Sequence, residues 1–115
     1  MEKALWIAKV QEYDRALDDA PEAVKNDREI VLAAVKAHGC ALVSASAVLR
    51  NDPETVLAAV KDNGLALKYA STELRNDRDI VLAAVKQNGT ALEYASEELQ
   101  NDPEIEKAYF FFLLK

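Results

Sequence analysis

The sequence predicts an all-α protein made of tandem 25-residue helical repeats, with two short helices per copy, stacked as a small α-solenoid or compact array. The first observation is a strict period, because the dipeptide Asn-Asp begins at positions 26, 51, 76 and 101. The second is the similarity of whole units, since residues 51–75 and 76–100 are identical at 17 of 25 positions. The third is that apolar residues recur at helical spacing and no stretch alternates as a strand does.

The composition is typical of one folded repeat domain that spans residues 1–115. Half of the residues are apolar and 30% are charged. The net charge of −6 argues against nucleic acid as a partner, because binding to phosphates needs clustered cations. The apolar runs are far shorter than the roughly 20 residues of a membrane span. We therefore expect no membrane partner, no signal peptide and, by default, a cytoplasmic location.

The period divides the chain into five copies. Residues 1–25 form a divergent N-terminal cap, 26–50, 51–75 and 76–100 are full copies, and 101–115 form a truncated C-terminal cap. The first copy is only weakly similar to the others, but its apolar residues at 10, 16, 17, 20 and 24 fall at the equivalent positions. Terminal copies of repeat proteins commonly drift in this way. The abrupt end is also compatible with a longer array.

The first half of each copy predicts one long helix, at about 52–63 in the third copy. Asp52 is a suitable N-cap, and Pro53 suits the first helical position because its missing N–H is not needed there. Lys61 falls in the last turn, and Gly64 is predicted to end the helix in the left-handed conformation. The equivalent helices are expected at about 27–38, 77–88 and 102–114.

The second half of each copy predicts shorter helical pieces. Residues 65–70 can make about two turns, and Ser71 then caps a final turn that ends at Arg75. Helices this short are not stable alone in water. They must be held by neighbouring copies, and the recurring alanines predict close approach between helices.

A second period of two copies is visible in the residue after Asn-Asp, which alternates between arginine and proline at 28, 53, 78 and 103. Over residues 26–100, the pattern N-D-(R/P)-E-I-V-L-A-A-V-K-x-N-G-x-A-L-x-Y-A-S-x-E-L resembles the tandem repeat of the domain-of-unknown-function 4116 family. The units of that family are about two copies long, which agrees with the alternation. The resemblance implies no activity and no catalytic residues.

Three polar ladders recur with the period. The aspartates at 27, 52, 77 and 102 are predicted N-caps, although stacked carboxylates and amides are also suitable cation ligands. The asparagines before them are predicted to bond a carbonyl of a neighbouring loop and so tie copies together. Lys36, Lys61 and Lys86 are predicted to complement helix dipoles and stay solvated, although such a stripe could also meet an acidic ligand.

The residues of enzyme chemistry are scarce. His38 is the single histidine and falls at a helix end, and Cys40 is the single cysteine. Together they form neither a catalytic dyad nor a zinc set. The three glycines are isolated helix caps and not a phosphate-binding loop. We expect no catalysis, no cofactor and no metal.

Positions that differ between copies are the better candidates for recognition, because they build the surface of a stacked array while shared positions build its core. The two tyrosines Tyr69 and Tyr94 lie one repeat apart and could form an aromatic strip. Alternatively, they could be half-buried packing residues whose hydroxyl groups contact water. The apolar end at 109–114 could cap the stack or meet another chain. The predicted protein-binding surface comprises Leu65, Lys68, Tyr69, Thr72, Thr90, Glu93, Tyr94, Glu97, Phe110, Phe111 and Phe112.

The sequence therefore predicts a non-catalytic protein-interaction or scaffold module. Its partner would be a protein or peptide, with self-association through the aromatic C-terminus as a further expectation. The alternative is a domain that binds a metal or small ligand with the acidic Asn-Asp ladder.

Overall fold

The computed structural model describes residues 2–114, and every regular element in this range is a helix. Each copy begins with a long α-helix, and in the last four copies its bounds agree with the sequence prediction to within about one residue. The long helices are α1 (Lys3–Glu12), α3 (Arg28–Ala37), α5 (Pro53–Asp62), α6 (Arg78–Gln87) and α8 (Pro103–Leu113).

The second half of a copy contains the two predicted pieces as separate helices, so a full copy has three helices and not the two that were predicted. The first piece is a six-residue 3-10 helix: η1 (Gly39–Ser44), η2 (Gly64–Tyr69) and η4 (Gly89–Tyr94). The second piece is a single turn: α2 (Glu22–Lys25), α4 (Ala47–Arg50), η3 (Leu74–Asn76) and α7 (Glu97–Gln100). The two pieces are separated because Ala70 adopts an extended conformation, after which Ser71 caps the next turn through the Leu74 N–H.

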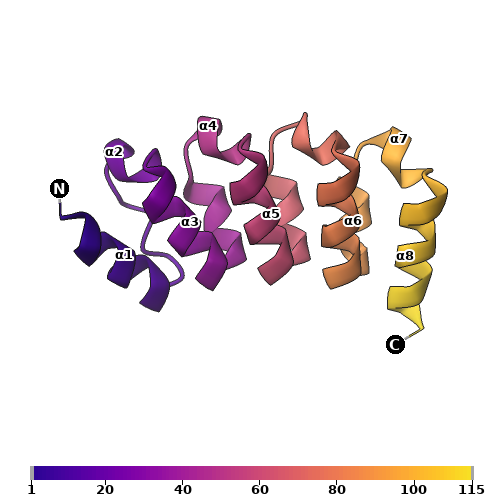
Figure 1. Ribbon diagram of the computed structural model, residues 1–115, viewed down its shortest axis with the longest axis horizontal. Coiled ribbons are helices and arrows are strands. Elements are labelled where there is room, and N and C mark those ends of the chain that lie inside the picture. Colours follow the sequence, from indigo (N-terminus) through magenta and orange to yellow (C-terminus); the bar gives the residue numbers. More distant parts are fainter. Residues whose placement is uncertain (1, 115) are drawn as a thin grey trace.

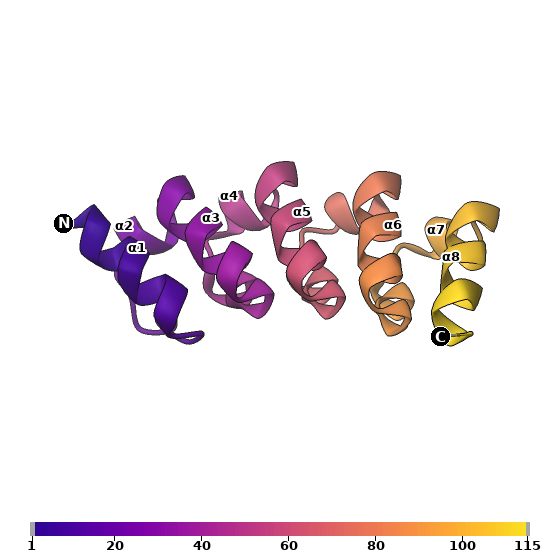
Figure 2. The same ribbon diagram turned by 60° about the horizontal axis from the view of Figure 1, so that its bottom comes forward.

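The copies follow one another along the longest axis of the molecule, whose extents are 46 × 27 × 18 Å (Figure 1). Each long helix packs on the next, in the order α1, α3, α5, α6 and α8. The 3-10 helices form a second row, in which η2 contacts both η1 and η4. The one-turn helices line the upper edge in Figure 1 and lie behind the long helices when the bottom of the molecule is turned forward (Figure 2).

The core is a continuous strip of small and branched side chains between these rows. In α5, Val56 and Val60 are fully buried, as is Ala59 between them. Leu67 of η2 fills the space behind them and is also fully buried. The predicted register of the divergent first copy is confirmed, because its apolar residues Val10, Leu17, Ala20 and Val24 are buried.

The repeated glycines do not adopt the left-handed conformation that the sequence predicted, because no residue in the described range has positive φ. Asn63 ends α5 in an extended conformation instead, and its side chain accepts from the Leu65 N–H to cap η2. Gly64 is required for another reason. A Cβ there would lie 2.4 Å from the carbonyl oxygen of Ala84 in the next copy. The glycine is thus a packing residue between copies.

Candidate functional site

The recurring aspartates cap the N-termini of the long helices, as predicted. Asp27 accepts from the Ile30 N–H at 3.0 Å, and Asp52 accepts from the Thr55 N–H at 3.2 Å. Asp77 and Asp102 cap α6 and α8 in the same way. Within residues 2–114, no three Asp, Glu, His or Cys side chains converge as they would to hold a metal ion.

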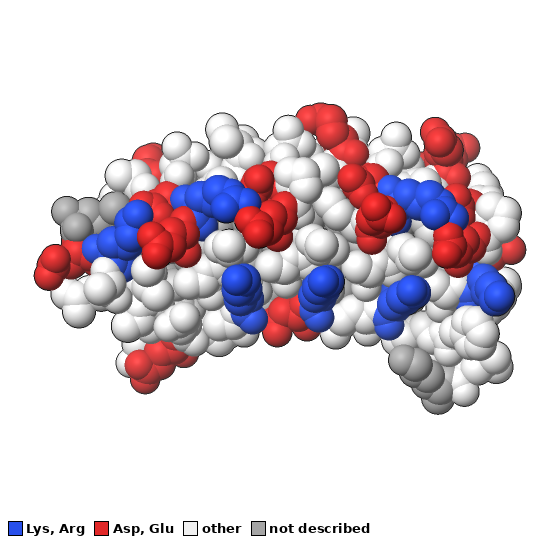
Figure 3. Space-filling view, viewed as in Figure 1, with Lys and Arg blue, Asp and Glu red and all other residues white. Residues whose placement is uncertain are grey.

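Ion pairs across neighbouring copies account for the two-copy period. Arg28 bonds Asp52 at 3.1 Å and also pairs with Glu54. Arg78 repeats this arrangement with Asp102 and Glu104. Where proline replaces arginine at the same helix position, this cation is lacking. Figure 3 shows the result as an upper row of mixed charges that crosses the long helices.

The pKa values of these carboxyl groups reflect the contacts. The Ile30 N–H, followed by the Lys3 ammonium 3.1 Å away, lowers the pKa of Asp27. The Arg78 guanidinium is the main cause that lowers the pKa of Asp102. These carboxylates are therefore stabilised in their charged form by the array itself.

The asparagine ladder ties neighbouring copies, but through a different partner from the one predicted. The side-chain oxygen of Asn26 accepts from the Ser46 hydroxyl at 2.7 Å, and Asn76 accepts from Ser96 at 2.6 Å. The backbone of the serine adds a second bond, because the Ser46 N–H donates to the carbonyl of Lys25, the residue before Asn26. Each serine thus joins two successive one-turn helices.

One position that varies between copies also joins neighbouring copies, and this role was not predicted from the sequence. The Asp62 carboxylate accepts from the Gly39 N–H at 2.7 Å, and the Gln87 side chain accepts from the Gly64 N–H. Both side chains reach back one copy, to the start of the preceding 3-10 helix. An acceptor that recurs at this position was the available signal, although alanine at residue 37 obscures it.

Comparison with known families agrees with this two-copy architecture. The model of the family described as Domain of unknown function (DUF4116) matches residues 6–50, 52–100 and 77–107. The chain belongs to the DUF4116 family. Each of the first two matched segments covers nearly two 25-residue copies, which is the period set by the arginine–proline alternation. No curated protein and no solved structure matches the chain.

Most of the predicted surface residues of this DUF4116 array lie on or next to the 3-10 face, which we define as η1, η2 and η4. Leu65, Tyr69 and Tyr94 are half-buried against the core, whereas Lys68 and Glu93 are exposed. Two further predicted residues, Thr72 and Glu97, are exposed on the turns that follow, and Thr90 is exposed on η4.

Lys68 lies beside one of the two tyrosines. The Lys68 ammonium lies 5.0 Å from the centroid of the Tyr69 ring. The Tyr69 hydroxyl, and after it Tyr94, raise the pKa of Lys68. The structure thus brings Lys68 and Tyr69 into one cluster of a phenol and a cation, and Tyr94 occupies the equivalent position one copy further along. Such a cluster presents both apolar surface and hydrogen-bonding groups to solvent.

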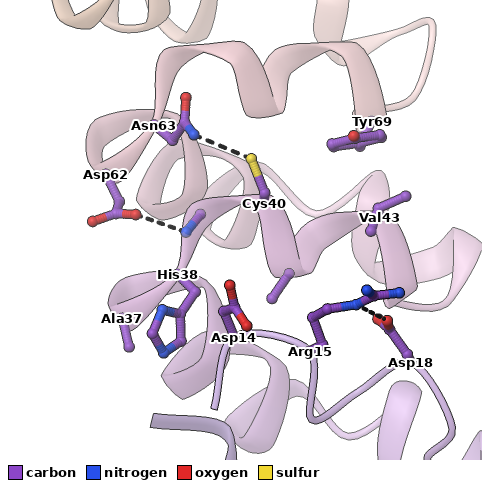
Figure 4. A pocket seen from close by; sticks show the side chains of 12 residues that line it. Asp14, Arg15, Asp18, Ala37, His38, Cys40, Val43, Asp62, Asn63 and Tyr69 are labelled. Atoms are coloured by element: carbon purple, nitrogen blue, oxygen red, sulfur yellow. Dashed lines mark hydrogen bonds and ion pairs between the residues drawn. The ribbon is translucent and has the colours of Figure 1, made fainter. Parts of the chain in front are cut away.

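A groove of about 490 Å³ borders the cluster at the N-terminal end of the 3-10 face. Figure 4 shows Asp14, Arg15 and Asp18 along one side and Cys40 and Tyr69 on the opposite side. Arg15 is bonded to Asp18 at 2.7 Å, so these two charges neutralise each other. The groove is open to solvent and differs from the deeply enclosed cavities that typically hold small molecules.

The single histidine and cysteine lie in this groove without forming a catalytic pair. The His38 ring nitrogen Nε2 lies 3.0 Å from the Gln11 carbonyl oxygen. Cys40 instead accepts from the Asn63 side-chain amide at 3.1 Å, and burial raises the pKa of its thiol. A raised pKa disfavours the thiolate, which is the nucleophilic form.

The aromatic C-terminal helix supplies the second part of the predicted surface, at the far end of the array. Phe112 lies half-buried against Gly89, at 2.3 Å from where a Cβ would be. Phe110 and Phe111 point outward and are 53% and 59% exposed. The three phenylalanines thus divide between capping the last full copy and forming an exposed patch with Leu113 and Leu114. Over the described residues, no helix has the length and apolarity needed to cross a membrane.

Proposed function

We propose that the chain is a small α-solenoid that serves as a non-catalytic protein-interaction module, and that it binds a partner protein or peptide on the 3-10 face. One observation carries this proposal. The shared aspartates, asparagines and serines bond within the array, whereas varied side chains at Leu65, Lys68 and Tyr69 stand on one face. A surface of this kind can change its specificity from copy to copy without loss of the stack.

The chemistry of the face supports a protein partner. Tyrosine is enriched at the centres of protein interfaces, because it offers a large contact area and a polar tip. The groove beside Tyr69 adds backbone and side-chain polar groups from η1, among them the exposed Cys40. An extended peptide could therefore lie along η1 and η2 and bond both.

The test is a quantitative affinity capture with full-length protein as bait. We expect proteins retained by the wild type to be lost with Tyr69→Ser plus Tyr94→Ser. The matched control is Val48→Ser, which changes a 71% exposed apolar residue on α4. Because both tyrosines are half-buried, a melting curve must show that the double variant is folded. Equal capture by all three baits would contradict the proposal.

Titration calorimetry with Ca²⁺ and Mg²⁺ separates this proposal from a metal-binding one. We expect no heat at millimolar cation, because the aspartates already accept from backbone N–H groups. Saturable heat that is lost in Asp52→Asn would support the acidic ladder as a cation site.

The exposed end of α8 favours a second contact, namely self-association. Phe110 occupies the position of Val60 and Val85, which are fully buried against the following copy. Burial of such a patch is favourable in proportion to its apolar area. Sedimentation velocity should show a concentration-dependent dimer that Phe110→Glu removes, whereas a monomer at all concentrations would contradict this contact.

A further inference from the structure

One position is shared by all three full copies and has no partner within the array. This is the lysine row, which we define as Lys36, Lys61 and Lys86. All three side chains are exposed, in the last turns of α3, α5 and α6. Within residues 2–114, the ion pairs involve other cations.

Stabilisation of the helix dipole does not fully account for the lysine row. A dipole requires a cation somewhere in the last turn and does not select one side of the helix. The last turn of α8 has no basic residue at all, although this helix is as long as the others. Figure 3 shows that cationic groups stand at regular intervals in a lower row across the face of the long helices.

Apolar grooves lie beside the lysine row. The groove between α3 and α5 has Leu57 and Ala58 in its lining, and charged residues stand at its margin: Lys36, Lys61, Glu54 and Asp62. The equivalent groove between α1 and α3 is lined by Leu32, Ala33 and the other side of Lys36. These leucines and alanines are also shared by all full copies, yet they are only partly buried. Each full copy therefore presents a partly exposed leucine and alanine next to an exposed lysine.

The strip between the two charge rows has the width of a single peptide helix. Glu54, in the upper row, precedes Lys61 by seven residues on α5, which places the two about 10 Å apart along the helix axis. A peptide α-helix with its side chains is about 10–12 Å across. A nucleic-acid duplex is far wider and would bring phosphates against the upper row, where Glu29 and Glu54 are exposed.

We propose that this face binds an acidic amphipathic helix of a partner protein, which lies across α3, α5 and α6. Carboxylates on one edge of that helix pair with the lysine row, and its apolar side chains rest on Leu57, Ala58 and their equivalents. Packed helices stand about 8–10 Å apart. Acidic residues seven positions apart on an α-helix, about 10.5 Å, match this spacing. This face is distinct from the 3-10 face. The proposal of binding at one face can therefore fail while the proposal for the other face holds.

The test uses a labelled synthetic 21-residue peptide with glutamate at every seventh position and leucines on the adjoining face. Fluorescence anisotropy would measure its binding to full-length protein at 50 mM and 200 mM salt. A scrambled peptide of the same composition serves as the ligand control. The protein variant is K36Q/K61Q/K86Q, and its matched control is K3Q/K9Q/K25Q, which removes the same charge at residues that line neither groove.

The wild type should bind the designed peptide more tightly than the scrambled one, and more weakly at high salt. The lysine-row variant should bind about tenfold more weakly, since exposed ion pairs contribute modestly each. The matched control should change affinity less than threefold, and K36R/K61R/K86R should bind as the wild type does. No binding of the designed peptide, equal binding of the scrambled one, or equal loss in both glutamine variants would overturn the proposal.

Discussion

Gly64 lies directly against the backbone carbonyl of Ala84, one copy further along the chain. A Cβ on the glycine would be 2.4 Å from that oxygen, and 3.1 Å from the backbone nitrogen of Asn88. Gly39 stands in the same relation to Ala59, also at 2.4 Å. The start of each 3-10 helix therefore touches the end of the next long helix, and the absence of a side chain sets how closely the copies stack.

We expect Gly64→Ala to destabilise the fold by about 1–3 kcal/mol, because a methyl group would have to push backbone aside. Gly89→Ala offers a matched comparison, since its Cβ would meet the Phe112 side chain. Phe112→Ala should relieve the cost of Gly89→Ala but not that of Gly64→Ala. Urea unfolding of the three single variants and of the two glycine variants combined with Phe112→Ala would measure this, and equal costs of Gly89→Ala with and without Phe112 would contradict it.

Asp27 should make the stability depend on acid pH. Its pKa is lowered in the folded state, so its stabilising effect is present above its unfolded pKa of about 3.9 and is lost as pH falls through the folded value. Asp27→Asn keeps a capping oxygen and should flatten the loss of stability below about pH 4. Asp27→Ala removes the cap as well and should cost about 0.5–2 kcal/mol at neutral pH. Chemical unfolding from pH 2 to pH 7 would compare the three; an unchanged pH profile in Asp27→Asn would contradict the assignment.

The asparagine–serine tie should contribute measurably to stability. Asn51→Ala removes the acceptor of the Ser71 hydroxyl and should cost about 0.5–1.5 kcal/mol. Ser71→Ala also removes the cap on the Leu74 N–H, so it should cost more than Asn51→Ala. Thermal melting of both variants is sufficient. An unchanged melting temperature in Asn51→Ala would show that the tie is not stabilising.

Leu67 and Leu92 occupy the same position in neighbouring copies but should respond differently to truncation. Leu67 is fully buried, and Leu67→Ala should cost about 2–5 kcal/mol, because it leaves a cavity in the strip of core. Leu92 lies near the end of the array and is only partly buried. Leu92→Ala should therefore cost clearly less. Equal values would mean that position in the array has no effect on local packing.

The sequence by itself determined the period, the bounds of the long helices and the roles of Asp52 and Ser71. These features are local, because a cap and the N–H groups it accepts from lie within about four residues. Only the tertiary structure decided that Gly64 is a packing glycine and that Asp62 reaches back to Gly39. It also decided which shared residues stay exposed, since that depends on partners 20 or more residues away, and no single copy specifies them.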